Sequence, residues 1–278
     1  MKKLLYAGKV RNIYEHVDIN KLCIETTDRL SSFDKHICNL DEKGKILNLT
    51  SVYMFNKTAH IIPNHYISHT NNTLIVKKCI PYKIEFVVRG YITGNTQTSL
   101  WTHYNKGVRN YCGIDFPEDL KKNQKLTKPV ITPTTKDVED IPISKEDIIN
   151  KNYMSKKECD FIYEKSMELF QYGQILADKA GFILVDTKYE FGKDENDNII
   201  LIDELHTCDS SRYWLKKTYN DKFSNNEEPD KLDKDCIRDW VKKQCNPYTD
   251  KIPNVPDELK LKTIESYCFF YNKISNVI

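Results

Sequence analysis

Residues 181–214 read GFILVDTKYEFGKDENDNIILIDELHTCDSSRYW, and this stretch decides the fold because it predicts a long hairpin. In its first strand Asp186, Lys188 and Glu190 alternate with mostly apolar residues, which are Ile183, Val185, Thr187, Tyr189 and Phe191. Alternate residues of a strand point to opposite faces of a sheet, so the three charged side chains share one face. The turn KDENDN follows, rich in the Asp and Asn that tolerate turn conformations.

The returning strand brings a further carboxylate to this face. If the hairpin closes symmetrically at 196–197, Glu190 lies opposite Asp203, with the two Cβ atoms about 5 Å apart. Two facing carboxylates repel unless a positive charge lies between them. Mg²⁺ suits this position because it takes oxygen ligands and needs only one or two carboxylates when it also holds phosphate oxygens. Two alternatives stay open: Lys188 neutralises both acids, or the hairpin is an ordinary solvated surface feature.

Length, charge and cysteine usage limit the class of protein. The 278 residues can bury a sizeable core in one or two domains, and a net charge of +2 does not favour a nucleic-acid partner. No apolar run is long enough to span a membrane, and the N-terminus lacks the apolar core of a signal peptide, so we expect a cytoplasmic protein without a membrane partner. The nine cysteines are scattered without a CxxC pair, which favours buried thiols over zinc ligands or disulfides. A homo-oligomer is compatible with the sequence, which leaves the oligomeric state open.

Strand-like segments dominate the first third and helical periodicity the last half, which indicates an α+β fold. Ser155 and Glu158 form a capping box that begins a helix ending at Gly181. The other expected elements are strands in 8–15 and 21–27, which form a hairpin, strands in 70–79 and 81–91, and helices in 46–62, 233–244 and 256–275. Residues 117–153 hold four prolines and are expected to form a long functional loop. We expect two lobes, 1–88 and 89–278, that join near Val88 and Arg89.

Several polar clusters could carry chemistry. A glycine turn followed by two cations, at Gly8, Lys9 and Arg11, is what a polyphosphate needs, although solvated strand residues are the alternative. Arg89 ends an apolar strand, where a cation needs an anionic partner. Arg212, in the motif CDSSR, could hold a phosphate or carboxylate bidentately, while a helix N-cap is the alternative for this motif.

The remaining polar candidates are less specific. Lys136 lies among hydroxyl groups in TPTTKD, where a proline turn is the alternative. His206 stands alone, which favours a structural hydrogen bond over a ligand role. Cations suited to phosphates and a carboxylate pair suited to Mg²⁺ together suggest an enzyme that uses a nucleoside triphosphate. They do not identify the molecule that accepts the phosphate.

Six motifs, in order, resemble the SAICAR synthetase family: GKVRNIY, DRLSSFD, EFVVRGYITG, KLxxP with TPTTK, VDTKYEFG and IDExxTxDSSRYW. The resemblance covers roughly residues 5 to 250, and ordered agreement is far more specific than any single motif. It implies a two-lobed fold, with an N-terminal antiparallel β-rich lobe, a C-terminal α+β lobe and ATP in the cleft. It also implies an ATP- and Mg²⁺-dependent ligase of de novo purine biosynthesis. That ligase joins L-aspartate to carboxyaminoimidazole ribotide through an acyl phosphate, giving SAICAR, ADP and phosphate.

The resemblance also implies roles for individual residues. Glu190 and Asp203 would hold Mg²⁺, Lys188 would lie beside the transferring phosphate, and Asp209 would help the aspartate amine lose its proton. Gly8, Lys9, Arg11 and Lys136 would bind ATP, and Lys136 would also border the substrate side. The segment containing Glu85 and Val87 would contact ATP through its backbone. The ribotide side would be bound by Asp34, Arg89, Asn95, Thr96, Ser210 and Arg212.

Three positions depart from the family pattern. Asn95 replaces a serine expected near the substrate phosphate, Cys208 replaces a proline, and Glu139 stands where the family has a histidine. The metal pair and the phosphate cations are intact, which predicts an active enzyme. Two rival functions stay open: a small-molecule kinase, which would need no amine, and a nucleotide-binding relative that leaves its substrate unchanged.

Overall fold

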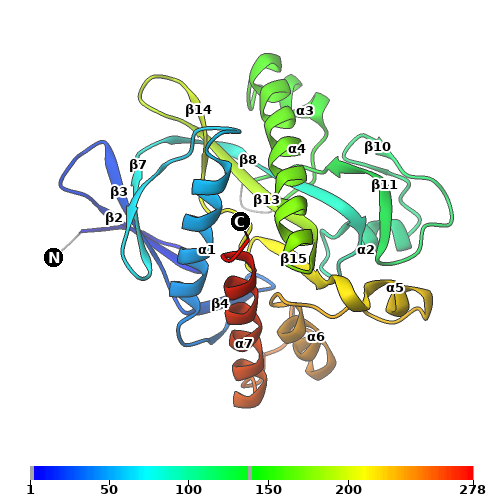
Figure 1. Ribbon diagram of the computed structural model, residues 1–278. Coiled ribbons are helices and arrows are strands. Elements are labelled where there is room, and N and C mark those ends of the chain that lie inside the picture. Colours follow the sequence, from blue (N-terminus) through cyan, green and yellow to red (C-terminus); the bar gives the residue numbers. More distant parts are fainter. Residues whose placement is uncertain (1–2, 137–139, 278) are drawn as a thin grey trace.

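The computed structural model describes residues 3–136 and 140–277 of the chain, so Glu139 lies outside the described residues (Figure 1). Its N-terminal part forms a five-stranded sheet in the order β1-β2-β3-β7-β6, and every neighbouring pair is antiparallel. The strands are β1 (Leu4–Ala7), β2 (Arg11–Glu15), β3 (Lys21–Thr26), β6 (Tyr66–His69) and β7 (Thr73–Lys77). The pairing of β2 with β3 confirms the hairpin expected between 8–15 and 21–27.

A six-stranded antiparallel sheet carries most of the charged residues singled out above. Its two long central strands, β8 (Ile80–Ile92) and β13 (Phe182–Lys193), pair with each other over most of their length. The other members are β11 (Gln124–Ile131) and β12 (Thr134–Thr135) on β8, and β14 (Ile199–Ile202) and β15 (Ser211–Leu215) on β13. Two small hairpins complete the strands: β4 (Arg29–Ser32) with β5 (Lys35–Asn39), and β9 (Asn110–Tyr111) with β10 (Ile114–Asp115).

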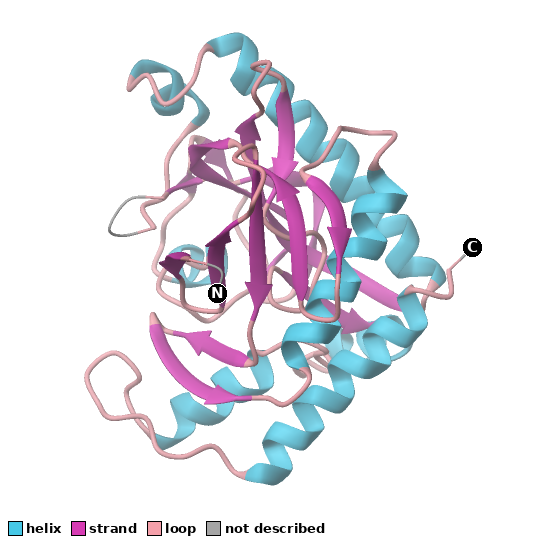
Figure 2. Cartoon of the chain, turned by 90° about the vertical axis from the view of Figure 1, so that its left-hand side faces the viewer, coloured by secondary structure: helices cyan, strands magenta, loops and turns pink. Residues whose placement is uncertain are grey.

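Helices gather along one side of these sheets, as Figure 2 shows, and α1, α4 and α7 lie in front of the strands in Figure 1. The helices are α1 (Lys43–Thr58), α2 (Leu100–Asn105), α3 (Lys145–Asn150), α4 (Lys156–Lys179), α5 (Lys216–Ser224), α6 (Asp235–Gln244) and α7 (Asp257–Ile274). The predicted capping box begins α4, because Ser155 Oγ accepts from Glu158 N while the Glu158 carboxylate accepts from Ser155 N. No helix in the described ranges is both long and apolar enough to cross a membrane.

One main core joins the helices to both large sheets. It includes Val76 of the N-terminal sheet, Phe86 of β8, Phe170 of α4 and Phe270 of α7. The proposed boundary at Val88 and Arg89 falls inside β8, and it stays a prediction.

Two expectations about local structure and one of the open alternatives were wrong. Residues 117–153 hold β11, β12 and α3 rather than one long loop. The strand β11 tolerates Pro129 because its register shifts between Lys125 and Val130, so no ladder hydrogen bond is needed from that position. The CDSSR motif leads into β15 rather than capping a helix.

The third error concerns the face pattern of β13. Its register against β15 shifts between Leu184 and Asp186, which is a β-bulge. Tyr189 therefore shares the main core with Leu184, while Val185 packs in a separate cluster with Trp214. A bulge inserts one residue and reverses the alternation, so the odd positions do not form a single face.

His206 is a buried structural hydrogen-bonding residue, as expected for a lone histidine. Its Nε2 lies 2.6 Å from Tyr189 Oη, and its ring packs against Gly173 of α4. A Cβ at Gly173 would lie 2.4 Å from His206 Cε1, so this contact requires glycine. Burial lowers the pKa of His206 to about 3. The nine cysteines are free thiols, as predicted, but only four of them are buried, which are Cys23, Cys38, Cys159 and Cys208, while the other five are half-buried.

The depressed pKa of His206 predicts how stability depends on pH. The folded protein keeps His206 neutral, whereas the unfolded chain takes up a proton below about pH 6.5. Acidification from this value towards pH 3 therefore destabilises the wild type relative to His206→Gln. Urea titrations should show the free-energy difference between them shrinking by about 2 kcal/mol from about pH 7.5 to about pH 5. An equal difference in the free energy of unfolding at both pH values would contradict a buried neutral imidazole at His206.

Candidate active site

The pairing of β8 with β13 sets the geometry of the candidate site. Asp186 pairs with Arg89, Lys188 with Val87 and Glu190 with Glu85, so charged residues from two strands meet on one face. This confirms that Asp186, Lys188 and Glu190 share a face. Because the strands are buried in mid-sheet, each of these charges needs a partner close by.

Glu85, Glu190 and Asp203 form one carboxylate cluster around Lys188. The Nζ of Lys188 lies 3.1 Å from Glu85 Oε1 and 3.4 Å from Asp203 Oδ2, and it also contacts Glu190. Lys136 contacts Glu190 from the other side. Lys188 therefore contacts both acids and neutralises them, as one of the alternatives predicted.

The register expected for the hairpin was wrong by one residue. Glu190 pairs with Ile202 rather than with Asp203, because the turn centres on Asn196. Asp203 follows β14 in a left-handed conformation, with a φ of 70°, and its carboxylate still reaches Lys188. Glu190 and Asp203 therefore both contact Lys188, although strand alternation alone does not predict the position of Asp203.

The two acids of this pair titrate differently. Burial raises the pKa of Glu190, and the neighbouring charge of Asp203 raises it further, while Lys188 and Lys136 oppose the shift. Burial acts in the same direction on Asp203, but Arg11, Lys188 and Lys136 outweigh it and hold its pKa well below the usual range. Burial and the neighbouring acid thus disfavour the charged form of Glu190, and a further positive charge beside it would favour that form.

The N-terminal turn supplies one cation to this cluster. Gly8 N donates to Arg11 O at 2.7 Å and closes the turn. Arg11 is largely buried and contacts Asp203 as well as Glu204 Oε1, the latter at 2.6 Å. Lys9 is exposed and pairs with Asp34 at 2.5 Å, so Asp34 lies at this turn.

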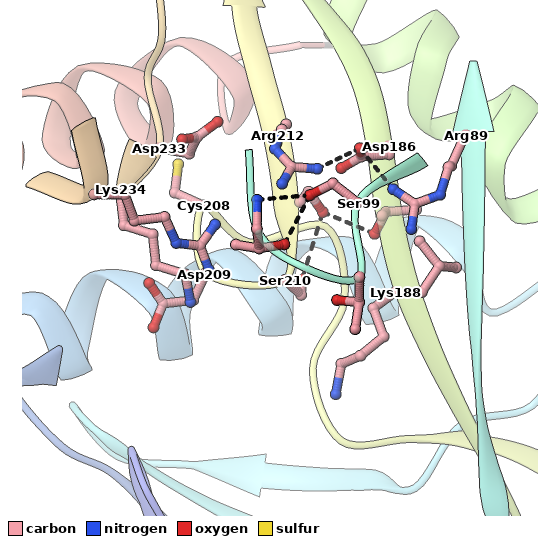
Figure 3. A pocket seen from close by; sticks show the side chains of 16 residues that line it. Arg89, Ser99, Asp186, Lys188, Cys208, Asp209, Ser210, Arg212, Asp233 and Lys234 are labelled. Carbon is pink, nitrogen blue, oxygen red and sulfur yellow. Dashed lines mark hydrogen bonds and ion pairs between the residues drawn. The ribbon is translucent and has the colours of Figure 1, made fainter. Parts of the chain in front are cut away.

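A polar cavity of about 230 Å³ opens beside the carboxylate cluster (Figure 3). Asp186 lies between two arginines, 2.6 Å from Arg212 and 3.6 Å from Arg89. Arg212 also donates to Asp235 at 3.0 Å. The residues that line the cavity are Val87, Arg89, Thr96, Thr98, Ser99, Asp186, Thr187, Lys188, Cys208, Asp209, Ser210, Ser211, Arg212, Asp233, Lys234 and Arg238.

The glycine turn after β8 brings hydroxyl groups to the cavity. Gly94 has a φ of 102°, and a Cβ there would lie 2.4 Å from Ser99 Oγ, so the turn needs glycine. Thr96 and Ser99 hydrogen-bond to each other through their hydroxyls at 2.7 Å, and both line the cavity. Asn95 instead donates to Asp239 of α6 at 2.6 Å. Its amide nitrogen therefore contacts α6, and the expected substrate contact of Asn95 stays a prediction.

Asp209 is held from two distant helices. Lys43 Nζ of α1 lies 2.7 Å from Asp209 Oδ2, and Tyr267 of α7 donates to Asp209 Oδ1 at 2.9 Å. Burial alone would raise the pKa of Asp209, but the charges of Lys234 and Lys43 outweigh it and hold that pKa well below the usual range. Asp209 is therefore held in its charged form by cations on two sides, and its expected role at the aspartate amine stays a prediction.

The backbone of the segment expected to contact adenine is already paired. Glu85 pairs with Thr134 of β12 and with Glu190 of β13. Val87 O accepts from Thr132 N at 2.8 Å. These backbone groups therefore have partners within the sheet, and their contact with adenine stays a prediction.

Several cavity residues escaped prediction from the sequence. Asp233, Lys234 and Arg238 come from the start of α6, where the run DKDCIR places charges at helical spacing. That spacing was the available signal for these three. Ser99 and the Lys43–Asp209 pair carry no local signal, because each depends on contacts between distant segments.

Comparisons with known proteins agree on one family. The sequence profile described as SAICAR synthetase matches residues 4–255. The chain is 49% identical over 271 residues to the chloroplastic phosphoribosylaminoimidazole-succinocarboxamide synthase of Arabidopsis thaliana, covering 96% of this chain and 66% of the plant protein. It is 48% identical over 273 residues to the synthase of Legionella pneumophila strain Lens, covering 97% of this chain and 87% of the bacterial protein.

Solved structures agree with the sequence comparison. A SAICAR synthase of Saccharomyces cerevisiae in complex with SAICAR superposes with a TM-score of 0.84 at 29% identity, covering 99% of this chain and 95% of the yeast chain. A SAICAR synthetase in complex with ADP superposes with a TM-score of 0.74 at 27% identity, covering 98% of this chain and 97% of that one.

The buried pair of Lys43 and Asp209 predicts an effect on stability. Lys43→Met would leave the Asp209 carboxylate buried without its closest cation, which should lower the free energy of unfolding by about 3 kcal/mol or more. Lys45→Met, two residues along the same helix at an exposed position, is the matched control and should change stability little. Urea unfolding of both variants measures the difference. Equal losses would show that Lys43 does not stabilise Asp209.

Proposed function

The chain belongs to the SAICAR synthetase family, and we propose that its cavity and its carboxylate cluster are two parts of one ligase site. The enzyme is an ATP-dependent ligase of de novo purine biosynthesis. It joins L-aspartate to carboxyaminoimidazole ribotide and forms SAICAR, ADP and phosphate. The observation that carries the proposal is the position of Lys188, which lines the cavity and also contacts all three acids of the cluster.

The reaction needs this arrangement because a carboxylate does not react with an amine directly. An oxygen of the ribotide carboxylate attacks the γ-phosphorus of ATP, and the bond to ADP breaks. The amine of aspartate then attacks the acyl carbon, phosphate leaves, and the amine nitrogen loses a proton. The first step depends on positioning and charge stabilisation, which the cations at the meeting point of cavity and cluster supply.

The carboxylate cluster fits Mg²⁺ held together with ATP. Glu190 and Asp203 would hold the ion, because two carboxylates suit a metal that takes its other ligands from phosphates and water. The bound ion would shield the charge of the phosphate oxygens. The described residues contain no group of three or more His, Cys, Asp or Glu side chains arranged to hold a metal alone, which agrees with a site completed by the nucleotide.

The cations around the cluster would bind the phosphates. Lys188 lies between the carboxylate cluster and the cavity, where its ammonium group would contact the phosphate that is transferred. Arg11 and Lys136 already contact the two metal-holding acids, and Mg²⁺ would release both to the phosphate oxygens. Gly8 and Lys9 would contribute the turn beside them, and the Glu85 and Val87 segment borders the same space.

The ribotide would occupy the cavity. Arg89 and Arg212 hold Asp186 between them and direct two guanidinium groups at the space, which suits a phosphate or carboxylate. Ser210 and Thr96 add hydroxyl donors, and Ser99 supplies the hydroxyl that Asn95 does not bring. Asp34 and Asn95, which contact Lys9 and Asp239 instead, have the weakest support among the predicted substrate residues.

The partners proposed for this chain are therefore small molecules. ATP, the ribotide and aspartate account for the charges of the site. A cytoplasmic location and a homo-oligomeric state stay predictions.

An omission experiment tests the proposed function against its rivals. ADP release is followed with ATP and Mg²⁺ while the ribotide and aspartate are left out in turn. Sustained ADP release is expected only with both present, because the acyl phosphate needs the amine to turn over. Release with the ribotide alone at the full rate would indicate a kinase, and none under any condition would indicate a nucleotide-binding relative.

The metal-holding role of Glu190 predicts the effect of a nearly isosteric change. Glu190→Gln should lower turnover by about a hundredfold or more, because one charge that balances the metal is lost. The fold should survive, since burial already disfavours the charged form of Glu190. Glu195→Gln, at an exposed position in the same hairpin, is the control and should keep normal turnover. Turnover near wild type in Glu190→Gln would remove Glu190 from the metal site.

A further inference from the structure

The turn between β1 and β2 is held through its carbonyl oxygens. Arg29 of β4 donates from Nη2 to Gly8 O at 3.0 Å and from Nε to Lys9 O at 3.2 Å. Thr27 holds the next carbonyl, because its backbone N–H and its hydroxyl donate to Val10 O at 3.0 Å and 2.8 Å. Arg29 and Thr27 therefore bind three successive carbonyl groups of the turn.

These contacts also set the direction of the backbone N–H groups. In a trans peptide the N–H points away from the carbonyl of the preceding residue, and the described residues contain no cis peptide bond. Because the carbonyls of Gly8 and Lys9 point to Arg29, the N–H groups of Lys9 and Val10 point away from it. Neither N–H has an acceptor among the residues that the structure describes. Successive N–H groups of this kind attract phosphate oxygens, whereas carbonyl oxygens in their place would repel them.

The guanidinium of Arg29 is itself held in a fixed position. The backbone carbonyl of Arg29 accepts from Lys43 Nζ at 3.0 Å, and this buried ammonium group also pairs with Asp209 of the cavity. Nη2 of Arg29 donates to Asn12 Oδ1 at 2.9 Å. No carboxylate in residues 3–136 and 140–277 forms an ion pair with Arg29, so its donors bind neutral oxygens. A planar guanidinium bound at several points fixes the orientation of its acceptors as well as their distance.

We propose that Arg29 is a positioning residue that directs the N–H groups of the turn at Gly8 and Lys9 towards the phosphates of ATP. The role rests on the proposed function and adds to it a residue that does not touch the substrate. Phosphoryl transfer depends on where the phosphate is held, so the orientation of the turn matters for the reaction. Without the guanidinium, the two carbonyls would be free to turn towards the phosphates, and binding would have to restore their orientation.

Calorimetric titration of wild type and Arg29→Gln tests the proposal without any turnover. The Kd of a non-hydrolysable ATP analogue with Mg²⁺ should rise about tenfold to a hundredfold, as expected for the loss of two charge-assisted hydrogen bonds. The Kd of adenosine should stay within about threefold, because adenosine has no phosphates for the turn to bind. An unchanged Kd for the analogue, or an equal rise for both ligands, would overturn the assignment.

Arg29→Lys separates orientation from charge. Lysine keeps the positive charge, but a single ammonium group does not reproduce the two-point contact with the carbonyls of Gly8 and Lys9. The positioning role predicts that most of the loss in affinity for the ATP analogue persists in this variant. A wild-type Kd in Arg29→Lys would show that charge alone is responsible and would overturn the positioning role.

Arg109 provides a matched control. Its guanidinium also binds backbone carbonyls, among them Tyr104 O at 2.9 Å, in a turn that does not line the cavity. Arg109→Gln should leave both Kd values unaltered. If Arg29→Gln does not fold, Thr27→Val tests the same turn, because it removes the hydroxyl donor to Val10 O with little change in shape. A rise of about threefold or more in the Kd of the analogue alone is then expected, and an unchanged Kd would contradict the role.

The omission experiment keeps this inference separate from the proposed function. A wild type that binds the analogue, loses affinity on Arg29→Gln and yet has no ligase activity would overturn only the proposed function. An active wild type whose affinity for the analogue is the same in Arg29→Gln would overturn only the role of Arg29.

Discussion

The pairing of β8 with β13 is the constraint on which the candidate site depends. It places Arg89, Val87 and Glu85 opposite Asp186, Lys188 and Glu190 in the middle of a sheet. A charged residue in such a position is costly unless it is paired, so each one recruits partners from other segments. Arg11, Lys136, Asp203 and Arg212 reach the same face from four different parts of the chain.

Charge balance links the fold to the chemistry. The carboxylate cluster is neutralised by lysine and arginine side chains, and these are the groups that a triphosphate with Mg²⁺ would engage. The same cations thus neutralise the carboxylates and, under the proposed function, would bind the nucleotide. The cavity next to it follows the same pattern, with arginines held by Asp186 and Asp235 and left able to bind a further anion.

Sequence reasoning succeeded where the structural rule is local. The alternation of Asp186, Lys188 and Glu190, the capping box at Ser155 and the pairing of the first hairpin all follow from spacing of a few residues. It also placed Arg89 and Arg212 in one site through ordered motifs. It failed at the bulge beside Val185, because a single inserted residue leaves no clear mark in the pattern of apolar residues.

Sequence reasoning could not predict contacts between distant segments. Asn95 meets Asp239 across 144 residues, and Lys43 meets Asp209 through the packing of α1. The strand β11 was mistaken for loop because its proline, Pro129, and its charges are tolerated by a bulged pairing with β8. In each case tertiary contacts, rather than local propensity, decide where the side chain lies.

The central claim is that Glu190 and Asp203 bind one metal ion, which also binds the triphosphate of ATP. A crystal structure with Mn²⁺ in place of Mg²⁺ and a non-hydrolysable ATP analogue tests it directly, because the anomalous signal of manganese locates the ion. The account predicts a manganese peak bound by both carboxylates and by phosphate oxygens, with Arg11 and Lys136 turned toward the nucleotide. A peak bound elsewhere, with both acids still paired to Lys188 and Arg11, would contradict it.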